Sequence, residues 1–145
     1  NTLVVRTAWL DGLYGRNFVK TILQLAAERP CLKIVADQRG CPTFAEDLAR
    51  MIGKLLAHPA QGVVHVTNAG DCTWHEFATE IVRLSGRSVP VEAITTADMP
   101  RPAKRPAYSV LSAERLHHLG FTMPSWQDGL QRFMKALPAV SSAVS

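Results

Sequence analysis

The feature that most constrains the fold is an alternation between short runs of β-branched residues and longer amphipathic stretches. Runs at 2–9, 32–36, 63–66 and 89–95 have the composition of buried strands. Between them, apolar residues recur every three or four positions, as in helices that bury one face. The alternation predicts an α/β fold with about three to four strands and four to five helices.

Capping residues predict where several helices begin. An asparagine, Asn17, precedes a helix that we expect to run to about Glu28, where Pro30 ends it. Three later helix starts have a Ser or Thr followed three positions on by an acidic residue, the spacing of a capping box. These pairs are Thr43 with Glu46, Thr73 with Glu76, and Ser125 with Asp128. The pattern favours independently capped helices between the strands.

The expected strands are too few for a self-sufficient doubly wound sheet. The first begins within two residues of the N-terminus, so we expect it to join a sheet contributed by residues that precede this chain. An unpaired edge of this kind could also pair two copies into a homodimer. We expect the ordered portion to be 1–138 and the small polar tail, 139–145, to be frayed.

Composition excludes several classes of protein. With 47% hydrophobic residues the chain has enough apolar surface to fold, and no apolar run is long enough to cross a bilayer, so we expect a cytoplasmic protein without membrane contact. The formal charge is +4, but the basic residues form no long run, which argues against nucleic acid as a partner. Three scattered cysteines and five scattered histidines predict reduced thiols and no metal site.

Local motifs reveal no complete catalytic apparatus. Neither a dinucleotide-binding glycine fingerprint nor a phosphate-binding P-loop occurs among the nine glycines. The chain has no nucleophile elbow, and neither tyrosine is followed four residues later by lysine. The sequence therefore predicts a unit that binds and orients rather than one that carries out chemistry alone.

Six strings, in order along nearly the whole chain, resemble the dTDP-4-dehydrorhamnose reductase family. They are Val5–Trp9 (VRTAW), Asn17–Ile22 (NFVKTI), Asp37–Thr43 (DQRGCPT), Val64–Asn68 (VHVTN), Pro102–Ser109 (PAKRPAYS) and Pro124–Gln127 (PSWQ). The resemblance covers only the C-terminal half of the family. It implies the substrate-binding portion of an extended short-chain dehydrogenase/reductase, with a Rossmann-like fold.

The family implies an activity and a cofactor. Its members use NADPH to reduce the 4-keto group of dTDP-4-dehydro-L-rhamnose, yielding dTDP-L-rhamnose, and a tyrosine donates the proton. The glycine-rich NADPH loop and the Tyr-Lys pair belong to the N-terminal half, which this chain lacks. We therefore expect the isolated chain to be inactive and the NADPH to be bound mainly by that missing half.

The resemblance also implies four substrate-binding residues. Trp9 lines the sugar pocket in the family, and its flat face is expected to pack on the hexose. At the start of the next helix, Asn17 is either a ligand contact or a plain N-cap. Lys104 and Arg105 are expected to bind the diphosphate, with Arg105 favoured because a guanidinium offers paired donors. No catalytic residue is expected in this chain.

Neighbouring residues are given structural roles or remain open. The stretch with Gln38, Pro42 and Thr43 lies near the nucleotide in the family, although Thr43 is expected to cap a helix. Trp74 and Trp126 are expected to pack in the core. Ala8 and Asp11 depart from the usual RTSWVY opening of the family, in which a serine and an aromatic residue stand at these positions.

Two alternative functions remain open from the sequence. One is a non-catalytic binding module of the same superfamily, resembling the regulatory subunit of methionine adenosyltransferase. The other, from a different class, is a small basic nucleic-acid-binding domain. That second reading predicts basic residues interleaved with aromatic ones on one face, whereas the cluster at 101–106 has only Tyr108 nearby.

Overall fold

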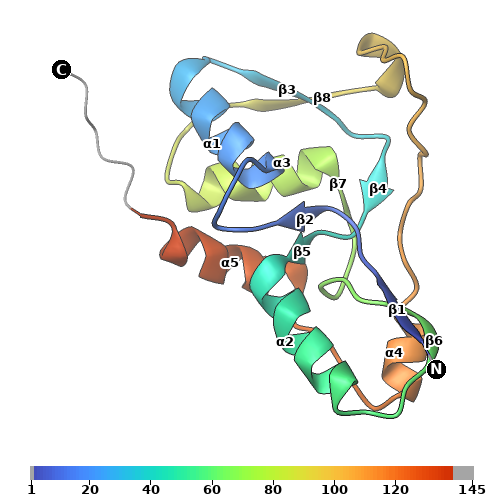
Figure 1. Cartoon of the computed structure of the whole chain (residues 1–145). Coiled ribbons are helices and arrows are strands. Elements are labelled where there is room, and N and C mark those ends of the chain that lie inside the picture. Colours follow the sequence, from blue (N-terminus) through green and yellow to red (C-terminus); the bar gives the residue numbers. More distant parts are fainter. Residues whose placement is uncertain (1, 139–145) are drawn as a thin grey trace.

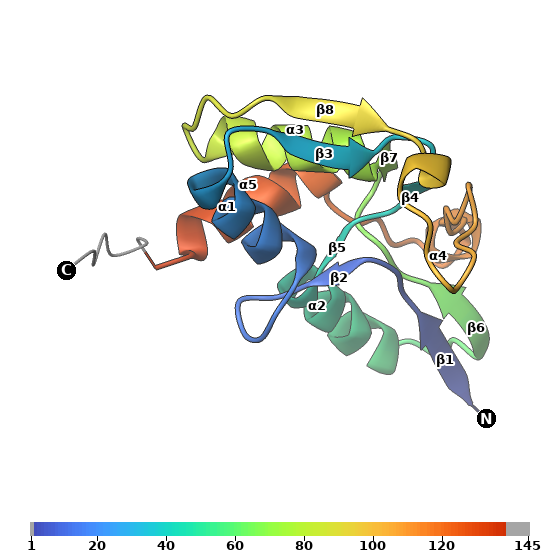
Figure 2. The same ribbon diagram turned by 90° about the horizontal axis from the view of Figure 1, so that it is seen from above.

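The longest strands lie in two parallel pairs at opposite ends of the molecule (Figures 1 and 2). In this computed structural model, which describes residues 2–138, β1 (Leu3–Arg6) pairs with β6 (Gly62–His65) and β3 (Leu32–Val35) pairs with β8 (Val91–Ile94). Two shorter ladders lie between these pairs. They are the parallel β2 (Leu10–Asp11) with β5 (Thr43–Phe44), and the antiparallel β4 (Arg39–Gly40) with β7 (Cys72–Thr73).

Five α-helices alternate with these strands in the described residues. They are α1 (Phe18–Glu28), α2 (Ala45–Leu56), α3 (Trp74–Leu84), α4 (Glu114–His118) and α5 (Trp126–Ala136), and a 3-10 helix covers Thr96–Asp98. The predicted α/β class is therefore confirmed. The four longer strands match the expected number, whereas the four two-residue strands have no periodicity from which they could be predicted. The expected frayed tail, 139–145, lies outside the described residues.

The larger hydrophobic core lies between α1, α3, α5 and the β3–β8 pair. The helix α3 contacts both of these strands as well as α1 and α5 (Figure 2). Its Phe77 and Ile81 are completely buried, as are Val19 and Leu130 from the flanking helices. Each such side chain contributes roughly 1.5–3 kcal/mol by leaving water. This core fixes the first turns of α1 and α3 relative to each other.

A smaller core lies beneath the β1–β6 pair. Val64 and Val66 are buried there against Leu55 of α2 and Leu116 of α4. On the other face of β1, Val4 is 44% exposed. One face of this pair is therefore covered by the described residues, while the other is open. The expectation that β1 joins a larger sheet, or a second copy, stays a prediction.

Three of the helix starts agree with the capping signals. The side chain of Asn17 accepts a hydrogen bond from the Lys20 N–H, and that of Ser125 from the Asp128 N–H. At α3, Thr73 and Glu76 form the complete reciprocal capping box. These contacts satisfy backbone donors that would otherwise lack partners in the first turn.

The capping box expected at Thr43 and Glu46 was wrong. Thr43 is fully buried in the ladder with β2, and its hydroxyl has no partner among the described residues. The helix begins at Ala45, and the buried carboxamide of Asn68 accepts the hydrogen bond of the Phe44 N–H instead. Glu46 pairs with Arg50 on the helix surface. The first turn of α2 therefore has no side-chain cap among the described residues.

The first predicted strand, 2–9, is broken. It ends at Arg6, and the chain turns at Trp9, whose φ of 46° lies in the left-handed region. A bulky residue there costs roughly 1–3 kcal/mol of backbone strain. The turn sends the chain on to β2 and rotates the Trp9 side chain out of the strand.

No helix in the described residues is long and apolar enough to span a bilayer.

Candidate functional site

Two adjoining cavities lie where α1, α3, β3 and the loop after β8 meet. The larger has a volume of about 930 Å³ and runs along α1 and β3, whereas the smaller has about 400 Å³. Three residues line both: Gln38, Trp74 and Arg105. Of the expected site residues, Arg105 therefore joins both cavities, Lys104 lines the larger and Trp9 the smaller.

The loop after β8 is held at both ends by the turn that contains Gln38. The backbone N–H and hydroxyl of Thr96 donate to Asp37, at 2.9 and 2.7 Å. At the far end, the Arg39 N–H donates to the Ala107 carbonyl at 2.8 Å. We call the stretch between these anchors, residues 97–106, the cationic segment. Hydrogen bonds from Thr96 lower the pKa of Asp37, which keeps this anchor ionised.

The lining of the larger cavity is cationic. The cationic segment contributes Arg101, Lys104 and Arg105, and the described residues of the wall include no Asp or Glu. All three side chains are exposed, and none forms an ion pair with another described residue. Their charges are thus available to an anion that enters the cavity. The structure brings Lys104 and Arg105 to the same cavity. That they bind a diphosphate stays a prediction.

Both faces of the Trp9 indole are covered. One face stacks on Trp74, with ring centroids 3.5 Å apart and planes inclined by 12°. A Cβ built on Gly40 would lie 2.5 Å from Cζ2 and 2.8 Å from Nε1 of Trp9. The three atoms nearest to this Cβ all belong to Trp9 and none to Trp74, although the two rings are only 3.5 Å apart, so Gly40 lies against the opposite face of the Trp9 indole. The edge of the indole is what remains for a ligand.

Trp74 is the residue of this site that the sequence did not reveal. It was expected in the core, and it does pack there, against Phe18 at a centroid distance of 4.6 Å. Yet it is only half-buried and lines both cavities. Its partner Trp9 is 65 positions away, so no local spacing could signal the pair. By contrast, Trp126 is buried as expected, with an edge-to-face contact to Phe77.

The side chain of Asn17 is engaged within the protein. Its carboxamide oxygen accepts the hydrogen bond of Lys20, and its Nδ2 donates to the Gly12 carbonyl at 2.6 Å. It lines neither of the two cavities. These contacts describe an N-cap that also fixes the loop before α1. A ligand contact through Asn17 stays a prediction.

Asp11, one of the departures from the family pattern, is buried at the start of α1. Its carboxylate is 2% exposed and accepts a hydrogen bond of 3.4 Å from the Val19 N–H. Burial raises the pKa of Asp11 to about 6, against the smaller lowering effect of this bond. The position next to a helix N-terminus favours the ionised form, but burial outweighs it.

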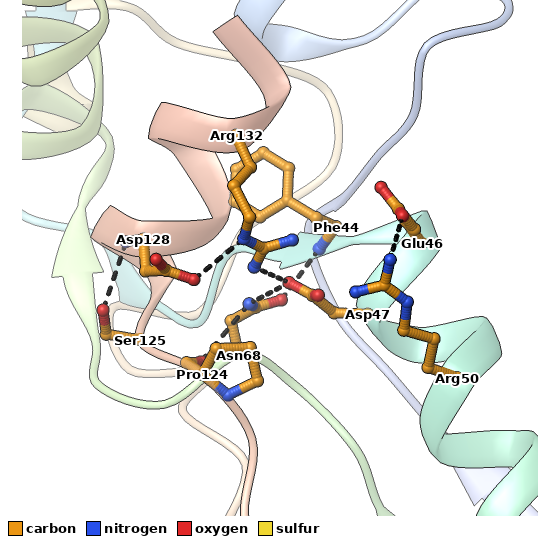
Figure 3. A network of polar contacts seen from close by, with 9 residues as sticks. All are labelled: Phe44, Glu46, Asp47, Arg50, Asn68, Pro124, Ser125, Asp128 and Arg132. Carbon is orange, nitrogen blue, oxygen red and sulfur yellow. Dashed lines mark hydrogen bonds and ion pairs between the residues drawn. The ribbon is translucent and has the colours of Figure 1, made fainter. Parts of the chain in front are cut away.

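A buried polar network joins α2, the end of β6 and α5 (Figure 3). The Asn68 carboxamide donates to Asp47 at 2.7 Å and to the Pro124 carbonyl at 3.3 Å. Arg132 donates to the same Asp47 oxygen at 2.7 Å. Burial favours a raised pKa for Asp47, but hydrogen bonds from Arg132 and Asn68 outweigh it and lower the pKa. The network lines neither cavity and ties the two cores together.

Residues suited to metal binding or nucleophilic catalysis are not gathered in the described part of the chain. No group of three or more His, Cys, Asp or Glu side chains could hold a metal ion there. All three cysteines are free, and burial raises the pKa of the Cys72 thiol. The arrangement can bind and orient an anion beside a pair of aromatic rings.

These features define an α/β unit in which a cationic cavity adjoins a pair of stacked tryptophans. The chain matches the family described as the RmlD substrate binding domain over residues 1–138, and it belongs to that family.

Relatives extend beyond this chain. The spore coat polysaccharide biosynthesis protein SpsK of Bacillus subtilis (strain 168) is 39% identical over 93% of the chain and 47% of its own length. The dTDP-4-dehydrorhamnose reductase of Sinorhizobium fredii is 35% identical over 94% of the chain and 50% of its own length. The chain thus spans about half the length of the curated relatives that it matches.

A solved structure has the same fold. The dTDP-4-dehydrorhamnose reductase from Bacillus anthracis str. Ames, determined in complex with NADP, is 44% identical. It superimposes with a TM-score of 0.88 over 92% of this chain and 48% of its own. The predicted resemblance to about half the length of dTDP-4-dehydrorhamnose reductases is thereby confirmed.

Proposed function

We propose that this chain is the nucleotide-sugar-binding part of an NADPH-dependent reductase that converts dTDP-4-dehydro-L-rhamnose to dTDP-L-rhamnose. The observation that carries the proposal is the cationic wall formed by Lys104 and Arg105 beside the Trp9–Trp74 pair. A dTDP-sugar has the matching chemistry, since its diphosphate joins a nucleoside, which carries an aromatic base, to a hexose. Reductases of dTDP-sugars among the relatives support the same substrate class.

Within this proposal, the diphosphate lies against Arg105, which borders both cavities. A guanidinium can donate two parallel N–H groups to one phosphate, and Lys104 adds a second charge nearby. The nucleoside then occupies the larger cavity and the sugar the smaller one, next to Trp9. The chain's own contribution to catalysis is binding and orientation of the substrate.

The described residues do not fit NADPH. A dinucleotide needs a helix N-terminus with free backbone N–H groups at its pyrophosphate. The starts of α1, α3 and α5 are each capped by a side chain of this chain, and α2 carries Glu46 and Asp47 in its first turn. We therefore assign the cofactor to the part of the reductase outside this chain.

Titration calorimetry with two ligands tests the proposal. The chain is expected to bind dTDP-L-rhamnose and dTDP, and to show no micromolar affinity for NADPH. In the full-length protein, NADPH oxidation should depend on dTDP-4-dehydro-L-rhamnose. A chain that binds neither dTDP compound, or that binds NADPH at micromolar concentration, contradicts the proposal. Binding without turnover in the full-length protein would favour a non-catalytic module.

A further inference from the structure

We propose that Gly40 and Trp74 are positioning residues that hold the Trp9 indole between them, so that its edge, with the Nε1–H, contacts the sugar. This inference rests on the proposed function and adds to it the way in which Trp9 meets its ligand. The sequence alone suggested that Trp9 packs flat on the hexose. A ring whose two faces are both covered cannot do so. An N–H at its edge can instead donate to a hydroxyl or ring oxygen.

The Trp9 indole lies in a sandwich between the Trp74 ring and the Gly40 backbone. Trp74 covers one face of Trp9 with nearly parallel rings, and the Gly40 backbone covers the other so closely that no Cβ fits. Gly40 is also buried and paired with Cys72 in the β4–β7 ladder, so its backbone cannot easily yield. The indole plane is therefore fixed by elements on both sides.

The backbone of Trp9 supports the same conclusion. A φ of 46° turns the residue out of the β1 direction, and its carbonyl accepts a hydrogen bond of 3.0 Å from the Thr43 N–H. The left-handed conformation of a bulky residue persists only where its surroundings hold it. Here the surroundings are the stack on Trp74 and the ladder that contains Thr43.

The indole nitrogen is available to a ligand. Trp9 Nε1 donates no hydrogen bond to another described residue, and it is not one of the fully buried polar atoms without partners. It therefore reaches solvent, and Trp9 lines the smaller cavity together with Arg105. A diphosphate on Arg105 would carry the attached sugar to this edge. The N–H thus serves as a donor that distinguishes a dTDP-sugar from dTDP.

The decisive experiment replaces Trp9 with 3-benzothienylalanine, in which sulfur takes the place of the N–H and the ring size is retained. Binding is measured by calorimetry on the full-length protein, with dTDP-L-rhamnose and dTDP as probes. We expect the affinity for dTDP-L-rhamnose to fall roughly tenfold, the loss of about one hydrogen bond, and that for dTDP to stay unchanged. A change of less than twofold in dTDP-L-rhamnose affinity would overturn the edge-on contact.

Variants of the two positioning residues test the sandwich. Gly40→Ala, at a residue that lines neither cavity, is expected to weaken dTDP-L-rhamnose roughly tenfold while dTDP binding persists. Trp74→Ala is expected to weaken dTDP-L-rhamnose more than it weakens dTDP, because Trp74 lines both cavities, and Trp74→Phe should restore most of the loss. Circular dichroism of the coupled indoles should lose its exciton signal in Trp74→Phe, since one indole is gone. In a Trp9→Ala background, Gly40→Ala should have no further effect on sugar binding.

The outcomes separate the two proposals. If Gly40→Ala weakens sugar binding equally with and without the Trp9 indole, it does not act through Trp9 and the positioning role is refuted. If Gly40→Ala does not fold, the Trp74 pair and the benzothienylalanine variant still decide the question. If the unmodified protein binds neither dTDP nor dTDP-L-rhamnose, the proposed function fails and this inference fails with it. Binding of both, with no effect of any variant, refutes only this inference.

Discussion

Replacement of Asp11 by asparagine should stabilise the protein, and by an amount that depends on pH. The carboxylate is 2% exposed, and burial raises its pKa from 3.8 to about 6. At roughly 1.4 kcal/mol per pH unit, this corresponds to about 3 kcal/mol. Asn has nearly the same size and keeps an oxygen that can accept the hydrogen bond of Val19. The substitution therefore removes the buried charge and little else.

The direction of this pH dependence follows from whether the folded or the unfolded state holds the Asp11 proton more tightly. At about pH 3.5 the Asp11 carboxyl is largely protonated in both states, so burial costs little. As the pH rises, the unfolded chain loses this proton before the folded protein does, and the folded state loses stability until the pH exceeds about 6. The advantage of Asp11→Asn should therefore grow from near zero at low pH to about 3 kcal/mol at neutral pH.

Urea unfolding followed by far-UV circular dichroism, at a series of pH values, measures this difference. A matched control is Glu92→Gln, which replaces an exposed carboxylate on β8 that forms no hydrogen bond with another described residue. Its effect should not follow the same course with pH. A constant difference between Asp11→Asn and the wild type, or a variant less stable at neutral pH, would refute the reasoning.

Three further predictions concern the site and its supports. Arg105→Ala should weaken dTDP-L-rhamnose binding by about 2 kcal/mol, roughly 30-fold, and Arg105→Lys should recover part of this loss. The free energy of unfolding should stay almost unchanged, and unaltered affinity in calorimetry would contradict this role of Arg105. Asn68→Leu should lower the free energy of unfolding by about 3 kcal/mol, because the Phe44 N–H and the Pro124 carbonyl lose a buried partner; urea unfolding with a loss below about 1 kcal/mol speaks against it. Thr73→Ala should lower the free energy of unfolding by about 1 kcal/mol, because it removes the cap of α3, whereas Thr73→Ser should retain that cap. Equal melting temperatures of the two variants would contradict the capping role.

Sequence patterns were sufficient where the determinants are local. The apolar periodicity and caps predicted α1, α3 and α5 because Asn17, Thr73 and Ser125 each satisfy a backbone donor three residues away. The resemblance identified the family because its strings cover nearly the whole chain. The same strings suggested a ligand role for Arg105, which lines both cavities, and that role stays a prediction.

Long-range contacts account for what the sequence did not predict. The helix α2 has no side-chain cap, because pairing in the β2–β5 ladder keeps Thr43 out of the N-cap position, and the N–H of the actual N-cap residue, Phe44, donates to Asn68. Trp74 lines both cavities and stacks on Trp9, a residue 65 positions away that no local spacing connects with it. The burial of Asp11 depends on how α1 docks, which no local spacing expresses.

The anchoring of the cationic segment has a consequence for how specificity can diverge. Its two ends are held by Asp37 and Arg39, two residues apart, so they are separated by only about 7 Å of extended chain. Doubling the length of a closed loop costs only about 0.6 kcal/mol. Insertions between the anchors are therefore nearly neutral for folding while they change the wall of the larger cavity. Under the proposed function, a longer segment alters which nucleotide-sugar fits this cavity, in natural variation and in directed evolution alike.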